Sequence, residues 1–114
     1  MRFLAITALL LLTLCVGCHK VDVKTGTPKC IAKQIKAEDS KHTGVGAKVI
    51  KYKFQGKDVY VLDLCHKCPD AGSEVLDSDC KSLGSLGGMI GNCLINGEDF
   101  SKAEMIETVW QKKK

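Results

Sequence analysis

The sequence predicts an α+β fold: a small disulfide-linked domain in which an antiparallel β-hairpin, part of a sheet, is flanked by an N-terminal and a C-terminal helix. Three observations predict it. Apolar and polar residues alternate over residues 47–64, apolar residues recur at helical spacing in 28–41 and 99–113, and seven cysteines occur in 114 residues. With 45% hydrophobic and 26% charged residues, a chain of this length forms one globular domain rather than a disordered or multi-span membrane protein.

The first predicted helix covers residues 28–41. Thr27 is a favourable N-cap residue, and the proline that follows it suits the first helical position. Ile31 and Ile35 lie one helical turn apart among lysines and glutamine, which indicates an amphipathic helix. Cys30 lies in the first turn, and we expect it to tie this helix to the sheet.

Residues 47–55 and 58–64 predict the two strands of a hairpin. Apolar residues alternate with polar ones in the first strand, so that one face is buried. Gly56-Lys57 separates the strands, and glycine at the first position suits a type II′ turn. This turn predicts that Phe54 faces Val59.

The region after the hairpin predicts turns, a short strand at Glu74–Leu76 and a glycine-rich loop at 81–97. Five glycines occur in that loop segment, and glycines at this density let backbone pass close to backbone. We expect Cys80 and Cys93 to staple the loop.

The last predicted element is a helix over residues 99–113. Ser101 followed by Glu104 has the spacing of a capping box, and lysines at the C-terminus complement the helix dipole. Its apolar residues fall on one face: Ile106, Val109 and Trp110.

Residues 1–17 have the form of a secretory signal peptide. A positively charged N-terminus is followed by fourteen uncharged residues and then by a small residue at the cleavage site. A retained anchor helix is disfavoured, because a membrane-spanning helix needs about 20 apolar residues. Gly17-Cys18 resembles the end of a bacterial lipobox, although Cys15 stands where leucine is usual. Cys18 is therefore the candidate for lipidation, and ordinary cleavage after Gly17, which gives a secreted and lipid-free protein, is the alternative.

The predicted organisation is a signal peptide (1–17), a polar tether (18–27) and a single Cys-rich domain (28–114). Several acyl chains on Cys18 would hold the domain stably at a membrane. His19 permits sorting to the outer membrane in bacteria that sort lipoproteins. We therefore expect an exported protein at the outer membrane or the periplasm-facing envelope, with the membrane as a partner through the lipid anchor.

Cleavage leaves a cysteine-rich and lysine-rich chain. It loses Arg2, so 16 lysines face 13 carboxylates and the net charge falls from +4 to +3. No arginine remains to bind phosphates in a bidentate manner, so a nucleic-acid partner is not expected. Export favours disulfides. If Cys18 carries lipid, one cysteine stays unpaired among the five disulfide candidates: Cys30, Cys65, Cys68, Cys80 and Cys93.

Cys65-His66-Lys67-Cys68 is the one motif that resembles a reactive site. A C-x-x-C motif after a strand resembles thioredoxin-like redox sites, and a periplasmic or extracellular thiol–disulfide protein is the alternative function. A turn with Pro69 follows instead of a long helix, and no later proline exists to face the cysteines. A structural role in separate bridges is favoured. A single C-x-x-C knuckle does not predict zinc, and Asp77-Ser78-Asp79 lacks the calcium-loop pattern. We expect no metal, no cofactor and no enzymatic activity, since no catalytic motif occurs.

The cysteine and glycine pattern resembles an uncharacterised family of small cell-envelope lipoproteins, common in Bacteroidota, that carry a Cys/Gly-rich domain of unknown function. The resemblance covers roughly residues 28–101. Where family members often have a further cysteine and a proline, this chain has Gly84, Ser85 and Leu86. The matching positions are Cys30-Ile31, Val49, Tyr52, Gly56–Val61, Cys65, Cys68, Val75–Asp77, Cys80, Gly87-Gly88, Gly91, Cys93 and Phe100.

The resemblance implies export and a disulfide framework, and it implies no activity. Together with the residues it leads to a first hypothesis: a non-enzymatic, membrane-anchored envelope domain with a binding or structural role. The ligand or protein partner is unknown at this stage.

Overall fold

The computed structural model describes residues 21–40, 46–64 and 72–112. It is mostly β: one five-stranded antiparallel sheet has the strand order β4-β3-β2-β1-β7, and β5 and β6 form a two-stranded sheet. The predicted α+β fold with two flanking helices is wrong, because α2 is the only α-helix in the described residues. The elements are α2 (Lys29–Asp39), β1 (Lys48–Phe54), β2 (Lys57–Asp63), β3 (Gly72–Asp77), β4 (Ser82–Gly87), β5 (Leu94–Ile95), β6 (Glu98–Asp99), the 3-10 helix η1 (Phe100–Lys102) and β7 (Glu104–Gln111).

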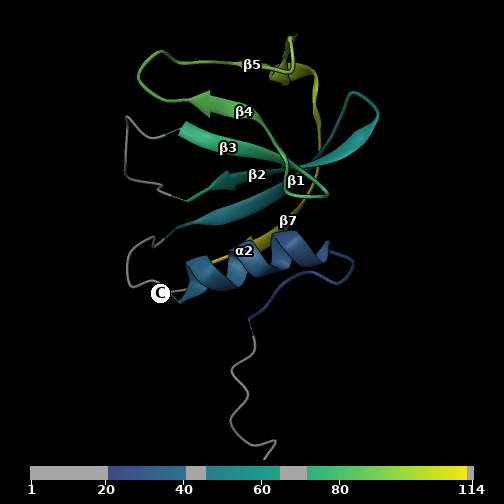
Figure 1. Ribbon diagram of the computed structural model, residues 1–114, viewed down its shortest axis with the longest axis vertical. Helices are drawn as coiled ribbons and strands as arrows, with labels where there is room; N and C mark the ends of the chain where they lie inside the picture. Colours follow the sequence, from purple (N-terminus) through teal and green to yellow (C-terminus); the bar gives the residue numbers. More distant parts are fainter. Residues whose placement is uncertain (1–20, 41–45, 65–71, 113–114) are drawn as a thin grey trace, which may run out of the picture.

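Helix α2 and the β5–η1 segment lie on opposite sides of the sheet (Figure 1). The core is accordingly divided into two clusters of buried residues. The helix-side cluster comprises Ile31, Ile35, Ala47, Val49, Tyr60, Leu62, Leu76, Val109 and Trp110. The loop-side cluster comprises Phe54, Val59, Val61, Val75, Ile95 and Phe100.

The predicted N-terminal helix is confirmed as α2, which buries Ile31 and Ile35. The prediction of Thr27 as its N-cap is wrong. Pro28 occupies that position without a side-chain cap, and the Thr27 hydroxyl donates to the Lys24 carbonyl at 2.7 Å instead. Thr27 therefore closes the turn before the helix.

The segment before α2 lies against β7. Val21 and Val23 pack against the helix-side cluster, and the Lys24 amide donates to the Val109 carbonyl at 2.9 Å. A Lys24–Glu107 ion pair at 3.7 Å adds a contact between the same two segments. Within the described residues, this segment is therefore part of the folded domain.

The β1–β2 hairpin is confirmed, but its turn lies one residue earlier than predicted. Phe54 pairs with Lys57, and Tyr52 rather than Phe54 pairs with Val59. Gln55 and Gly56 form the turn with φ values of 51° and 74°. Two left-handed residues define a type I′ turn, whose twist matches that of the strands. Moving the turn by one residue moves the pairing by two, so the predicted apolar face is retained.

Strand β3 contains the predicted strand Glu74–Leu76, whereas β4 lies where we predicted a loop. Two glycines of this region lie where neighbouring atoms leave little room for a Cβ atom. A Cβ atom at Gly84, where φ is +140°, would stand 3.1 Å from Cδ1 of Ile95, and one at Gly72 would stand 2.9 Å from the Leu86 carbonyl oxygen. Glycine here lets Ile95 cover β4 and lets β3 and β4 approach each other.

The predicted C-terminal helix over 99–113 is also wrong. Residues 100–102 form η1, which Asp99 caps by accepting from the Ser101 amide at 2.9 Å, and residues 104–111 form β7, paired with β1. The register shifts twice, between Val49 and Ile50 and between Lys51 and Tyr52. Each shift is a β-bulge that places two successive residues of β7 opposite one of β1.

The bulges explain why the sequence of β7 resembles that of a helix. Val49 pairs with Trp110 and Ile50 with Thr108, so Val109 is the extra residue of one bulge. Consecutive side chains in a bulge can face the same side, and Val109 and Trp110 are both buried in the helix-side cluster. The apolar spacing that favours a helix is therefore that of a doubly bulged strand.

Substitutions in β7 test this assignment. Trp110→Ala removes a large side chain that is 3% exposed, and we expect the free energy of unfolding to fall by about 3–5 kcal/mol. Ile106→Ala removes one that is 45% exposed, so the loss should stay below about 1 kcal/mol. Urea denaturation measures both. Equal losses would favour the helix, in which both residues share the buried face.

Candidate functional site

The cysteines show one bond and one free thiol among the described residues. Cys30 and Cys80 form a disulfide, so Cys30 ties α2 to the sheet as predicted. Cys80 is thus unavailable for the predicted staple with Cys93, whose thiol is free and exposed. The lipidation candidate Cys18 and the C-x-x-C pair Cys65 and Cys68 lie outside the described residues, and those predictions stay predictions.

Removing the disulfide tests its contribution. The bond joins residues separated by 50 positions, so the chain-entropy model gives about 4 kcal/mol of stabilisation. We expect the Cys30→Ala, Cys80→Ala double variant to lose most of that amount in urea denaturation. Cys93→Ala is the matched control and should change stability by less than about 0.5 kcal/mol. A similar loss in both proteins would contradict the assignment of the bond.

A pocket of about 170 Å³ lies where the turns of three hairpins approach one another, and we call it the turn-end pocket. It is bounded by the β1–β2 turn, the β5–β6 turn and the strand ends that flank the β3–β4 turn. Sequence reasoning missed it, because its residues are far apart in the chain. The lining residues are Phe54, Gln55, Lys57, Val59, Asp77, Leu83 and Asn96.

Left-handed backbone conformations of non-glycine residues occur in these three turns. Gln55, Cys80 and Asn96 are the described non-glycine residues with positive φ, at 51°, 64° and 51°. Each lies in a different one of the three turns. Gln55 and Asn96 are the first central residues of two-residue hairpin turns, which require positive φ at both positions.

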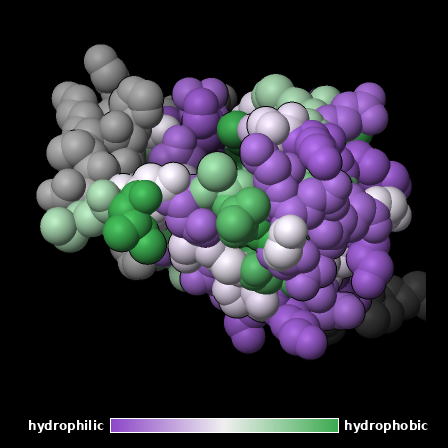
Figure 2. Space-filling view, turned by 90° about the horizontal axis from the view of Figure 1, so that it is seen from above, coloured by the Kyte–Doolittle hydropathy of each residue, from purple (hydrophilic) through white to green (hydrophobic). Residues whose placement is uncertain are grey.

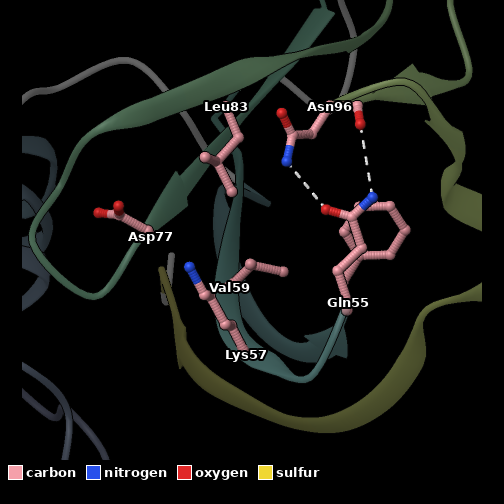
Figure 3. A pocket seen from close by; sticks show the side chains of 7 residues that line it. Gln55, Lys57, Val59, Asp77, Leu83 and Asn96 are labelled. Carbon is pink, nitrogen blue, oxygen red and sulfur yellow. Dashed lines mark hydrogen bonds between the residues drawn. The ribbon is translucent and has the colours of Figure 1, made fainter.

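Two side-chain amides join the β1–β2 and β5–β6 turns. Asn96 Nδ2 donates to Gln55 Oε1 at 2.9 Å, and Gln55 Nε2 contacts the Asn96 carbonyl oxygen at 3.4 Å (Figure 3). Gln55 Nε2 also donates to Glu98 Oε2 at 2.9 Å. These bonds fix one wall of the pocket and hold the two left-handed residues together.

The floor of the pocket is apolar, and two charged side chains, Asp77 and Lys57, lie at its edge. Phe54 and Val59 are buried members of the loop-side cluster, and Leu83 packs against them. The Asp77 carboxylate is directed away from the cavity (Figure 3), because its Oδ1 accepts from the amides of Asp79 and Lys81, both at 2.9 Å. Lys57 makes no ion pair with a described carboxylate and extends beside Val59 (Figure 3).

A second, more open recess of about 370 Å³ shares Lys57 and Asp77 with the turn-end pocket. It is polar, and an ion pair of 3.3 Å between Lys53 and Asp58 forms part of it. Lys57 therefore stands between an apolar cavity and a solvated polar recess. This arrangement suits a ligand with one apolar end and one charged end.

Two other electrostatic features lie outside the pocket. Burial raises the pKa of Tyr60, and the nearby Asp58 carboxylate adds to the rise. Hydrogen bonds from Ser101 lower the pKa of Asp99, which caps η1. In the described part of the chain, no group of three His, Cys, Asp or Glu residues is placed to hold a metal ion, and no helix has the length and apolarity to cross a membrane.

Exposed apolar side chains are scattered over the surface. Figure 2 shows separate apolar groups on a largely hydrophilic face. Met89 and Ile90 in the β4–β5 connection are 86% and 92% exposed, and Leu94, Met105 and Ile106 are exposed to a lesser degree. Exposed apolar residues are common in folded proteins, whereas the turn-end pocket combines a cavity with a cation, so we take it as the candidate site.

A double-mutant cycle tests the amide pair that forms its wall. Gln55→Ala and Asn96→Ala should each destabilise the protein, and the double variant should lose less than the sum by about 0.5–1.5 kcal/mol. The control cycle combines Gln55→Ala with Asn92→Ala, because the Asn92 amide donates to the carbonyls of Ser85 and Leu94 instead. That cycle should be additive in urea denaturation. Additivity in both cycles would show that the pair is not formed.

The comparisons with known proteins identify a family. A family model described as a domain of unknown function (DUF6970) matches residues 33–112, from within α2 to the end of β7. No curated protein and no solved structure matches the chain. The match covers more than half of the 114 residues and confirms the resemblance to an uncharacterised family. The chain therefore belongs to this family of domains of unknown function.

Proposed function

We propose that the protein is exported and held at a bacterial cell envelope through lipid on Cys18, and that it acts there by binding a ligand rather than by catalysis. The Cys30–Cys80 disulfide carries this proposal. Such bonds form and persist in oxidising compartments and are rare in the cytosol. The basic, then apolar start of the chain and the Gly17-Cys18 junction support the same route.

The fold supports a binding role for the anchored domain. Val21, which follows Cys18 by three residues, packs on the helix-side cluster. Phe54 and Val59 of the turn-end pocket belong to the loop-side cluster, on the other face of the sheet. An anchor at Cys18 would therefore hold the helix side nearer the membrane and leave the pocket accessible.

Intact mass spectrometry of the protein extracted from membranes tests the anchor. We expect loss of residues 1–17 and the added mass of acyl chains on Cys18. Cys18→Ala should abolish both the added mass and membrane retention. Cys15→Ala, which changes a cysteine inside the leader, is the matched control and should leave both intact.

Two results would contradict the anchor. A lipid-free protein in the culture medium, cleaved after Gly17, would support the secreted alternative. A cytosolic protein with its leader intact and its thiols reduced would overturn export altogether.

A further inference from the structure

We infer that the turn-end pocket recognises a carboxylate attached to an aliphatic group, with the apolar group in the cavity and the carboxylate on Lys57. This inference deepens the proposed binding role and rests on it. The same chemistry occurs in a free aliphatic acid and at the carboxyl terminus of a peptide whose last residue is aliphatic. The test below distinguishes these two sources.

The size and lining of the cavity define the apolar part. Pockets for drug-sized ligands usually measure about 300–1,000 Å³. The turn-end pocket measures about 170 Å³, so it suits a group no larger than one aliphatic side chain. Phe54 and Val59 lie beneath the cavity and are 3% and 1% exposed, and the half-buried Leu83 supplies its accessible apolar edge.

The distribution of charge defines the polar part. Three nearby carboxylates have other partners. Oδ1 of Asp77 accepts two backbone amides of its own turn, and Asp58 pairs with Lys51 and Lys53. Glu98 accepts from Gln55 and pairs with Lys102 at 3.8 Å. Lys57 is the cation of the lining and has no described ion-pair partner. An anionic group at the mouth would give this ammonium a partner.

The rigidity of the wall supports a preorganised site. The Gln55–Asn96 amide pair joins two turns at the mouth, and Gln55 also donates to Glu98. A site that is already ordered loses little conformational entropy on binding. Because Lys57 is exposed, its pairing with a carboxylate is weak, and we expect dissociation constants of about 1 mM.

The experiment is an NMR titration of the ¹⁵N-labelled protein with its Cys30–Cys80 disulfide intact, followed at the amides of Gln55, Gly56, Asn96 and Gly97. The probes are 4-methylpentanoate, its neutral analogue 4-methylpentanamide, and acetate, which lacks the aliphatic group. We expect 4-methylpentanoate to shift these signals, the amide to bind about three- to fivefold more weakly, and acetate to bind at least about tenfold more weakly. Equal binding of the acid and the amide would overturn the inference, as would the absence of any shift.

Variants locate the binding. Lys57→Gln should abolish the preference for the acid over the amide, whereas Lys33→Gln on the exposed face of α2 should leave it unchanged. Leu83→Phe, which fills the cavity from its half-buried edge, should abolish binding of the acid. Unchanged backbone signals away from the pocket would show that each variant folds. Retention of the preference in Lys57→Gln would overturn the role of the ammonium.

The peptides Gly-Gly-Leu and Gly-Gly-Leu-amide distinguish the two sources. Tighter binding of the free-acid peptide than of 4-methylpentanoate indicates a protein terminus, and weaker binding indicates a small acid. Cys18 acylation is measured separately, so failure of the anchor and failure of this inference can be told apart.

Discussion

The apolar character of β2 on both faces is the constraint on which the architecture depends. Val59 and Val61 face one cluster and Tyr60 and Leu62 face the other, so the four residues are buried without a break. A strand of this kind must be covered from both sides. Helix α2 covers one face, and the β5–η1 segment covers the other. The disulfide and the turn contacts hold these covers against the sheet.

The sequence predicts the elements whose stability is local and fails where distant contacts decide. Ile31 and Ile35 predict α2, and the alternation from Val49 to Leu62 predicts the hairpin, because each pattern is complete within its own segment. Strand β4 could not be predicted from its own segment, because Gly84 makes room for Ile95, which lies outside that segment. Strand β7 could not be recognised in the sequence, because two bulges shift its apolar residues out of simple alternation.

The candidate site was less predictable than the fold. Its floor belongs to the hairpin, but its walls come from turns that only the tertiary structure brings together. One local pattern was informative: Asn96-Gly97 is among the strongest sequence indications of a tight hairpin turn. It would have divided the predicted glycine-rich loop into strands. The partnership between Asn96 and Gln55, and the isolation of Lys57, could not have been inferred from spacing, since both depend on which turns meet.

The two bulges of β7 also affect how the sheet ends. An outer strand has unpaired backbone N–H and C=O groups with which a strand of another molecule can pair. Bulges disrupt the regular spacing of hydrogen bonds that such pairing requires. Lys24 already occupies the Val109 carbonyl on that side. On the opposite outer strand, Asn92 exchanges backbone bonds with Gly87 and caps the Ser85 carbonyl at 2.6 Å. In the described part of the chain, both outer strands thus have some of their backbone groups occupied, which leaves less backbone for a strand of a neighbouring molecule to pair with.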